Sequence, residues 1–188
     1  MKNIFKNAGI LLAITLVAAI ALSFVYELTK EPIALAAQKA KAEAYQEVYE
    51  TAAAFEDVDN AEALLKDYNT NLAAGTAVEE VLRTVDEAGA PLGYVLTVSA
   101  KGYAGPVRIA LGIDKSGTVV GYAVLEHEES PGFGANCENE DIKQQFLGIT
   151  AASQLDGITG ATITSNALRS ETQAAIDFVK TLEGGEAK

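Results

Sequence analysis

The sequence has few of the residues that build metal centres or disulfide frameworks. Its 188 residues include one cysteine, Cys137, one histidine, His127, and no tryptophan. A single cysteine excludes an internal disulfide and any site that needs several thiolates, such as an iron–sulfur cluster. A zinc site would also need more nitrogen or sulfur ligands than one histidine supplies. We therefore expect no metal centre in this chain.

Basic residues are also scarce, and the charge is unevenly distributed. The chain has 14 Lys and Arg against 26 Asp and Glu, which gives a formal net charge of −12. No acidic residue precedes Glu27, whereas Lys2 and Lys6 lie before it, so the rest of the chain carries a net charge of −14. Such a surface repels nucleic acid and anionic lipid headgroups. We expect no nucleic-acid partner.

A long apolar run stands at the N-terminus. Residues 7–26 are uncharged, and most are Ile, Leu, Val, Ala or Phe. As a helix this run would span about 30 Å, the thickness of the hydrocarbon core of a bilayer. The best A-x-A cleavage site, residues 34–36, lies well beyond the end of the run. This position favours an uncleaved anchor over the alternative, a cleaved signal peptide.

The charges on either side of the run predict its orientation. Lys2 and Lys6 lie on one side, and Glu27, Lys30 and Glu31 lie on the other. By the positive-inside rule the N-terminus is cytoplasmic. We predict a cytoplasmic N-terminus over 1–6 and a single-pass helix of the cell membrane over 7–28. Everything after it is then extracytoplasmic.

The rest of the chain predicts an α+β fold. Residues 29–75 are rich in Ala, Glu, Lys and Gln and predict a helical stalk or packing helices, broken near 57–60. Residues 76–188 are predicted to form a cofactor-binding domain. Short turns containing glycine separate four apolar segments, which predicts an antiparallel sheet. The predicted strands are 78–85, 93–100, 107–113 and 119–126, and flanking helices are predicted over 139–146 and 163–182.

One short segment carries recognisable chemistry. Gly160 and Ala161 precede Thr162 at the start of the last predicted helix. Unpaired N–H groups and the positive helix end favour a phosphate at such a position, and small residues admit a bulky group. Ordinary helix capping is the alternative from these residues alone. The chain has no Walker loop and no G-x-G-x-x-G, so we expect no bound NAD.

The segment resembles a known motif. Asp156-x-x-Thr159-Gly160-Ala161-Thr162 resembles the flavinylation motif of the FMN-binding domains in the Rnf and Nqr membrane redox complexes. In that family a flavin transferase takes FMN from FAD and joins its phosphate to the last Thr. The resemblance therefore implies a covalent FMN on Thr162, with the other four residues forming its surroundings.

Two further stretches resemble the same family, so the resemblance covers nearly the whole chain. Residues 102–106 (Gly-Tyr-Ala-Gly-Pro), followed by Ile-Asp at 113–114, resemble its Gly-Tyr-x-Gly-Pro turn and the next strand. Residues 127–134 resemble its His-x-Glu-[Thr/Ser]-Pro-Gly-[Leu/Phe]-Gly segment, with Gln-Phe at 145–146 downstream. The resemblance adds four residues to the expected cofactor site: His127, Glu128, Pro131 and Gly132.

The length favours the G-type subunit of the Rnf complexes, because the related C-type subunit of the Nqr complexes carries an insertion before the motif that has no place here. The resemblance implies an electron relay in an ion-translocating ferredoxin:NAD+ oxidoreductase, with Na+ or H+ as coupling ion. Its partners would be other membrane subunits and, during maturation, the transferase. The activity belongs to the assembly, since no acid, base or nucleophile triad appears. Three alternatives remain: the Nqr C-type subunit, a stand-alone extracellular flavin carrier, and an anchored binding or structural module without cofactor.

Several other residues have plain structural interpretations. His127 is a candidate for a hydrogen bond to the flavin or to its own loop, and Pro131-Gly132-Phe133-Gly134 for a tight turn that lets the backbone approach the ring. Tyr103 and Tyr122 could stack on the flavin, although strand packing explains both. The acidic neighbours of Cys137 predict a raised pKa and no redox role for its thiol.

Overall fold

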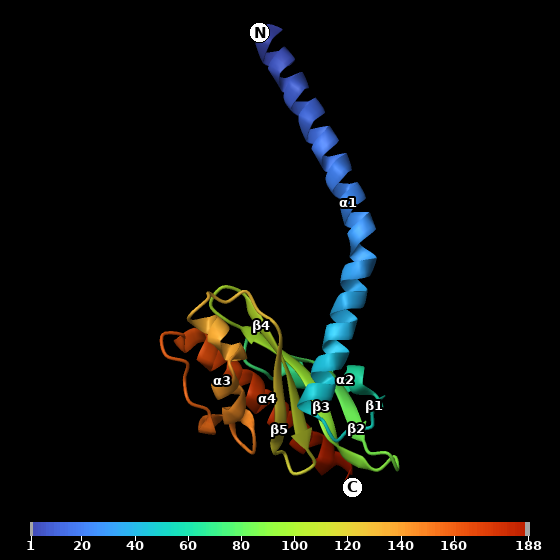
Figure 1. Ribbon diagram of the computed structural model, residues 1–188, viewed down its shortest axis with the longest axis vertical. Coiled ribbons are helices and arrows are strands. Elements are labelled where there is room, and N and C mark those ends of the chain that lie inside the picture. Colours follow the sequence, from blue (N-terminus) through green and yellow to red (C-terminus); the bar gives the residue numbers. More distant parts are fainter. Residues whose placement is uncertain (1, 187–188) are drawn as a thin grey trace. The chain divides into compact units, whose positions relative to one another are not determined.

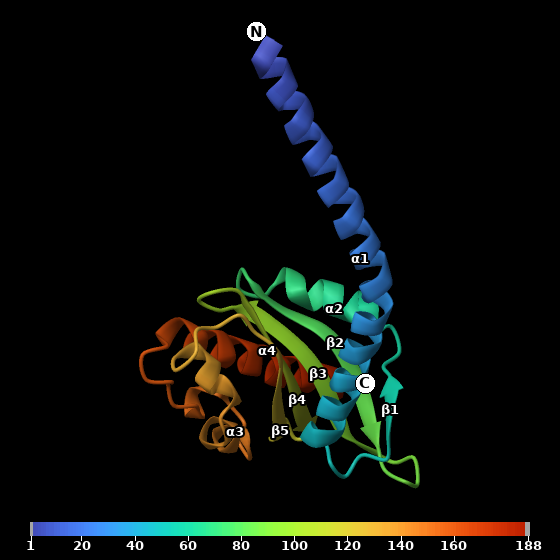
Figure 2. The same cartoon turned by 45° about the horizontal axis from the view of Figure 1, so that its top comes forward.

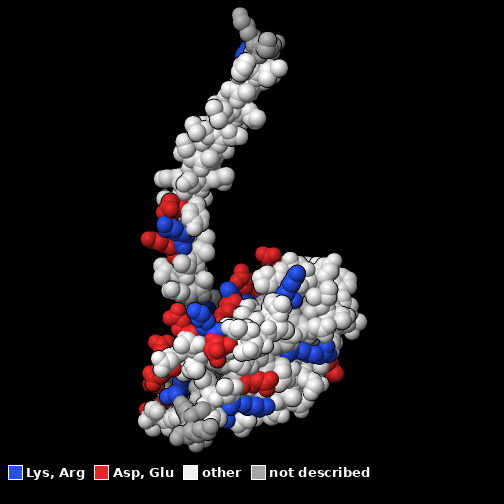
Figure 3. Space-filling view, turned by 180° about the vertical axis from the view of Figure 1, so that it is seen from behind, with Lys and Arg blue, Asp and Glu red and all other residues white. Residues whose placement is uncertain are grey.

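The computed structural model describes residues 2–186, and the chain divides into two compact units, Met1–Lys41 and Ala42–Lys188. Helix α1 (Lys2–Val48) makes up the described part of the first unit and continues without interruption through Pro32. It is long and apolar enough to cross a membrane, and its most apolar window is fully exposed. In Figure 3 no charged side chains are seen on α1 between its N-terminal end and the first cluster of charged residues along the helix. These properties agree with the predicted anchor.

The second unit contains an antiparallel sheet, as predicted, but with five strands where four were expected, and each strand lies beside the next in the chain (Figure 1). Alternating apolar residues and short turns explain this meander, because each strand pairs at once with the one before it. The strands are β1 (Ala54–Asp57), β2 (Thr76–Val85), β3 (Pro91–Lys101), β4 (Pro106–Asp114) and β5 (Val119–Glu126). The helical elements after α1 are α2 (Ala61–Thr70), η1 (Gly134–Glu138), α3 (Glu140–Phe146), η2 (Ala152–Gln154) and α4 (Thr162–Glu186).

One local prediction is wrong. A helix was expected to run from residue 32 to a break near 57–60, but α1 ends at Val48 and residues 54–57 form the edge strand β1. Only Phe55 in this strand is partly buried, so the segment lacks the alternation of apolar and polar residues by which a half-buried strand is identified in a sequence. Its pairing with residues 82–85 of β2 makes it a strand. Residues 42–75 therefore belong to the compact unit instead of a separate stalk.

The main core lies between one face of the sheet and helix α4 (Figure 2). Leu96, Ile109 and Leu111 of the central strands are fully buried there, against Ile176 and Phe178 of α4. Because side chains alternate along a strand, every second residue of β3 and β4 points into this layer. The layer fixes α4 along the sheet, and so fixes where its first turn lies.

The opposite face of the sheet holds the end of α1. Tyr45 and Val48 pack there with Tyr49 in a smaller core. Two paired glycines, Gly112 of β4 and Gly121 of β5, leave a flat area in which the carbonyl of Val48 lies against their Cα atoms. A side chain at either position would occupy the space of that backbone. The two glycines thus form a seat for the end of α1.

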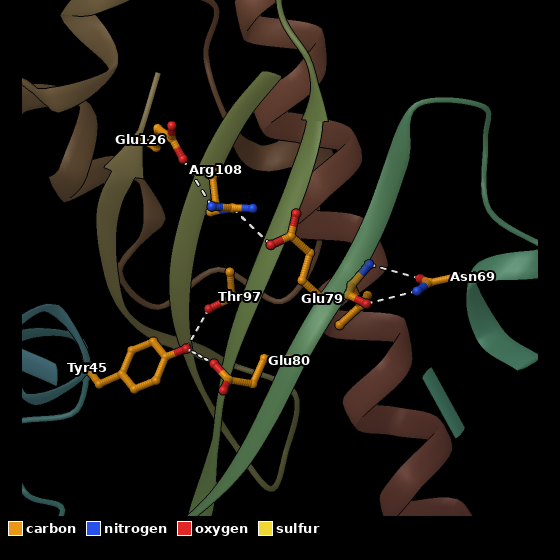
Figure 4. A network of polar contacts seen from close by, with 8 residues as sticks. Tyr45, Asn69, Glu79, Glu80, Thr97, Arg108 and Glu126 are labelled. Atoms are coloured by element: carbon orange, nitrogen blue, oxygen red, sulfur yellow. Dashed lines mark hydrogen bonds and ion pairs between the residues drawn. The ribbon is translucent and has the colours of Figure 1, made fainter. Parts of the chain in front are cut away.

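Polar contacts reinforce this second face (Figure 4). The hydroxyl of Tyr45 donates to Glu80 and lies 2.6 Å from the hydroxyl oxygen of Thr97. On the neighbouring strands, Arg108 pairs with Glu79 at 2.8 Å and with Glu126 at 3.0 Å. Arg108 therefore links β2, β4 and the end of β5, where the chain leaves the sheet and enters the loop that follows β5.

Candidate functional site

A pocket of about 520 Å³ lies at the first turn of α4, which we call the Thr162 pocket. Three separate segments line it: the turn between β3 and β4, the loop after β5, and the start of α4. The lining residues are Tyr103, Glu129, Ser130, Phe133, Gly134, Gly160, Ala161, Thr162, Ile163 and Thr164. The three stretches that resembled one family therefore meet at one place in the fold.

Thr162 is the first residue of α4, and its side chain is exposed in the pocket. The N–H groups of the first helical turn have no carbonyl four residues earlier to bond. Among the described residues, no partner is found for the N–H groups of Thr162, Ile163 and Thr164. These groups and the positive end of a 25-residue helix favour an anion beside the Thr162 hydroxyl.

The loop before Thr162 is held by a local hydrogen-bond network. The hydroxyl of Ser165 donates to the Ala161 carbonyl at 2.9 Å and accepts from the N–H of Ile158 at 2.8 Å. Arg169 donates twice to the carbonyl of Leu155, at 3.0 and 3.2 Å. The chain from 155 to 162 is thereby fastened to the helix it precedes, which fixes the position of the Thr162 hydroxyl.

Gly160 makes the last turn before the helix possible. Its φ of +79° lies in the left-handed region, where residues with a side chain are strained. A Cβ at this position would also stand 3.0 Å from the ring of Phe133 across the pocket. Phe133 is 56% exposed, so the ring and the Gly160 backbone form an apolar wall that is open to a ligand.

Glu129 connects the three segments. One carboxylate oxygen accepts from the N–H groups of Tyr103 and Ala104, at 2.7 and 3.1 Å. The other accepts from the hydroxyl of Thr164 at 2.6 Å. Glu129 is 6% exposed, and bonds to a buried charged group are stronger than bonds between neutral groups. We call this arrangement the Glu129 clamp, because it joins the turn, the loop and the helix.

His127 supports the clamp from outside the pocket. Its Nδ1 accepts from the N–H of Glu129 at 3.1 Å, so the proton of the neutral ring is on Nε2. That Nε2 lies 3.0 Å from a carboxylate oxygen of Glu138. Both ring nitrogens are therefore engaged by the loop and η1, and the structural interpretation of this histidine is supported.

The structure brings only some of the predicted site residues to the pocket. Gly160, Ala161 and Thr162 line it. The other predicted residues lie in the loop after β5 or in the loop before α4, but they do not line the pocket: Asp156, Thr159, His127, Glu128, Pro131 and Gly132. Glu128 is exposed and its carboxylate lies against Gly105, whereas Gly132, at φ +80°, makes the turn that carries Phe133.

The sequence did not single out Glu129, Thr164 and Phe133 as site residues. Glu128 and Glu129 are adjacent and chemically identical, but the Glu of the His-x-Glu segment falls at position 129, which is the signal that could have identified Glu129 in place of Glu128. Thr164 follows Thr162 by two residues and could equally be an ordinary residue of the first turn. The sequence offered one signal for Phe133: it lies in the loop that resembles the family, at a position where the family has either Leu or Phe.

The pocket suits a flavin phosphate in size and chemistry. Its volume falls within the range of small-molecule sites, about 300–1,000 Å³. Tyr103, Phe133 and Ile163 offer exposed apolar surface at its mouth, and Thr162 offers a hydroxyl beside free N–H groups. None of the described lining residues is Lys, Arg or His, so helix N–H groups and side-chain hydroxyls are the donors available to a phosphate there. Within residues 2–186, no cluster of three potential metal ligands is found.

Cys137 lies in η1 near the pocket and is fully buried. Burial raises the pKa of its thiol to about 12, and Glu138, Glu129 and Glu171 add to the shift. The predicted direction is confirmed, with burial as the larger cause. At pH 8 we expect the folded protein to react with a disulfide reagent at least ~1,000-fold more slowly than urea-unfolded chain, because so little thiolate is present. Rapid stoichiometric labelling of the folded protein would contradict this.

Comparisons with known proteins agree with the geometry. Residues 102–177 match the family model of the FMN-binding domain, and residues 1–48 match that of the RnfG N-terminal region. The G-type subunit of the ion-translocating oxidoreductase complex of Methanosarcina acetivorans is 31% identical over 192 residues, covering 97% of this chain and 98% of that protein. Its counterpart in the Na+-translocating ferredoxin:NAD+ oxidoreductase complex of Acetobacterium woodii is 30% identical over 201 residues, covering 96% and 94%. The crystal structure of Shewanella oneidensis NqrC covers 71% of this chain and 74% of its own, at 15% identity and a TM-score of 0.45.

Proposed function

This chain belongs to the G-type subunits of the ion-translocating oxidoreductase complexes, and on that premise we propose that it carries a covalent FMN in the Thr162 pocket. The family predicted from the motifs is thereby confirmed. The protein is an electron-transfer subunit, and the oxidoreductase activity is that of the whole complex. Its relative in Acetobacterium woodii is named for electron transfer between ferredoxin and NAD+. We assign the same reaction to the complex that this chain joins.

One observation carries the assignment of the site: three segments far apart in the sequence converge on one pocket around an exposed Thr162 hydroxyl. A bound FMN supplies the electron chemistry, since its ring accepts and releases electrons. In our proposal the Thr162 oxygen is joined to the phosphate, and the first-turn N–H groups of α4 bind the remaining phosphate oxygens. The Glu129 clamp holds the walls, and Tyr103 and Phe133 contact the ring.

The residues outside the lining have a second role in the proposal. Asp156 and Thr159 are exposed on the loop that leads to Thr162, so they are accessible to the transferase that attaches the flavin. His127, Pro131 and Gly132 shape the loop that carries Glu129 and Phe133. A covalent link suits an extracytoplasmic protein, because a cofactor lost there could not be replaced.

We further propose that α1 crosses the membrane once, with Lys2 and Lys6 on the cytoplasmic side. The partners are then other membrane subunits of the complex and, before assembly, the transferase. The charge bias around the apolar run supports this orientation. Protease added to intact cells should cleave residues 42–188, and protection of that unit in intact cells would reverse the orientation.

The decisive test is a denaturing gel viewed under ultraviolet light, on full-length chain made together with the transferase. Wild type should give a fluorescent band because denaturation removes any flavin that is not covalently bound. Thr162→Ala should be dark, and Thr162→Ser should stay fluorescent because it keeps the hydroxyl. A dark wild-type band, with the transferase active on another substrate, would refute the covalent cofactor.

A further inference from the structure

One buried acid takes no part in the site described so far. Glu171 lies on α4 with an exposed fraction of 0%, and neither carboxylate oxygen has a hydrogen-bond partner among the described residues. An ionised carboxylate in such a place is strongly unfavourable unless it is paired. A glutamate there therefore binds a proton more readily than an exposed one does, and its charged form is sensitive to further negative charge nearby.

The groups around Glu171 do not neutralise it. The charged or titratable groups that act on it electrostatically are Glu79 of β2, Tyr122 of β5 and Cys137 of η1, and none of them carries a positive charge. Burial raises the pKa of Glu171 well above its ordinary value and Glu79 adds to it, whereas the nearby backbone N–H of Ala100, which makes no hydrogen bond of normal geometry to the carboxylate, lowers it. No described Lys, Arg or His forms an ion pair with Glu171.

The place of Glu171 relative to the Thr162 pocket follows from the helix. It comes seven residues after Thr164, which lines the pocket, so it lies on the same face about two turns, or ~10 Å, along the axis. Cys137 lies near both acids, since Glu129 of the pocket and Glu171 both act on its thiol. Glu129, Cys137 and Glu171 are all buried, and both carboxyl groups act electrostatically on the thiol.

We infer that Glu171 is a redox-linked proton site, which binds a proton when negative charge arrives in the Thr162 pocket. The inference rests on the proposed function, because the charge is the electron delivered to the flavin by a partner subunit. The balance is one electron onto the flavin and one proton from bulk water onto the Glu171 carboxylate. At ~10 Å and an effective dielectric constant of ~20, one added charge raises the pKa of an acid by about one unit.

Two measurements test this on full-length protein in detergent. The first needs no flavin: urea unfolding between about pH 5 and pH 9, followed by tyrosine fluorescence. An acid whose folded pKa is raised destabilises the fold once the pH exceeds its unfolded pKa, and the loss grows until the folded pKa is reached. The unfolding constant of wild type relative to Glu171→Gln should therefore rise up to tenfold for each pH unit. A ratio independent of pH would overturn the proton site.

The second measurement is the slope of the flavin reduction potential against pH. Protonation of the flavin itself contributes equally to wild type and to Glu171→Gln. Wild type should take up at most about half an additional proton per electron, over a window of about one pH unit on the alkaline side, because the pKa shifts by only about one unit. Glu171→Gln should lack this uptake, and Asp177→Asn, which removes an exposed acid from the same helix, should keep it. A merely structural role would shift the potential equally at every pH.

The outcomes separate the two proposals. A chain that carries no flavin refutes the proposed function and with it the redox linkage. A flavin-loaded chain whose slope is unchanged in Glu171→Gln refutes the proton site alone.

Discussion

Replacing Gly121 by alanine is expected to lower the free energy of unfolding by about 3 kcal/mol. The added Cβ would overlap the carbonyl, the carbonyl carbon and the Cα of Val48, which are backbone atoms without a rotamer to change. The end of α1 would have to lift from the sheet and expose the apolar contacts of Tyr45 and Tyr49. Urea unfolding of the full-length protein in detergent, followed by tyrosine fluorescence, measures the effect.

The matched control is Gly184→Ala near the end of α4. Nothing lies within 4 Å of a Cβ at that position, and alanine favours helix more than glycine. We expect this variant to equal or exceed wild type in stability, by up to ~1 kcal/mol. If Gly121→Ala behaved like Gly184→Ala, the close contact between the end of α1 and the sheet would be refuted.

Glu129→Ala is expected to cost about 3–4 kcal/mol and to abolish most flavin attachment. The variant leaves the N–H groups of Tyr103 and Ala104 and the buried Thr164 hydroxyl without their partner and opens a cavity between the three segments. With the clamp gone, the turn carrying Tyr103 is no longer held to the start of α4. Urea unfolding gives the stability, and in-gel fluorescence gives the yield of attached flavin.

Two further variants separate the effect of losing the hydrogen bonds of the clamp from the effect of losing a negative charge. Glu129→Gln can still accept both N–H groups and can donate to Thr164, so it should lose less than half as much stability as the alanine variant. Glu128→Ala removes the neighbouring exposed acid and should stay within ~0.5 kcal/mol of wild type. Equal losses of stability in Glu128→Ala and Glu129→Ala would show that the loop does not turn Glu129 inward and Glu128 toward solvent.

Much of the architecture could be predicted because it depends on local patterns. A run of twenty uncharged residues identifies a potential membrane helix by length and hydropathy, whatever follows it. The strands β2 to β5 alternate or are apolar throughout, and short turns leave little choice but an antiparallel meander. Thr162 could be placed at a helix start because the motif and the helical pattern adjoin. These features need no knowledge of distant contacts.

Strand β1 and the end of α1 could not be predicted for the opposite reason. Ala54–Asp57 has no strand pattern of its own, and its conformation comes from hydrogen bonds to β2. The Ala-rich and Glu-rich composition that surrounds it favours helix, and tertiary pairing overrides that preference. Likewise Gly112 and Gly121 resemble ordinary strand glycines until their pairing places them together beneath Val48.

The sequence by itself predicted a helix long and apolar enough to cross a membrane, four of the five strands and the last helix, and its motif places the proposed flavin attachment at the start of that helix. Each of these follows from residues that are neighbours in the chain. Only the tertiary structure decided that Glu129 turns inward while Glu128 faces solvent, and that Glu171 is buried without a partner among the described residues. Acidic residues almost always face water, and apart from the His-x-Glu segment that contains Glu129, no local pattern marks such exceptions. Their burial is set by the turn, the loop and the helix that pack around them, which come together only in the folded chain.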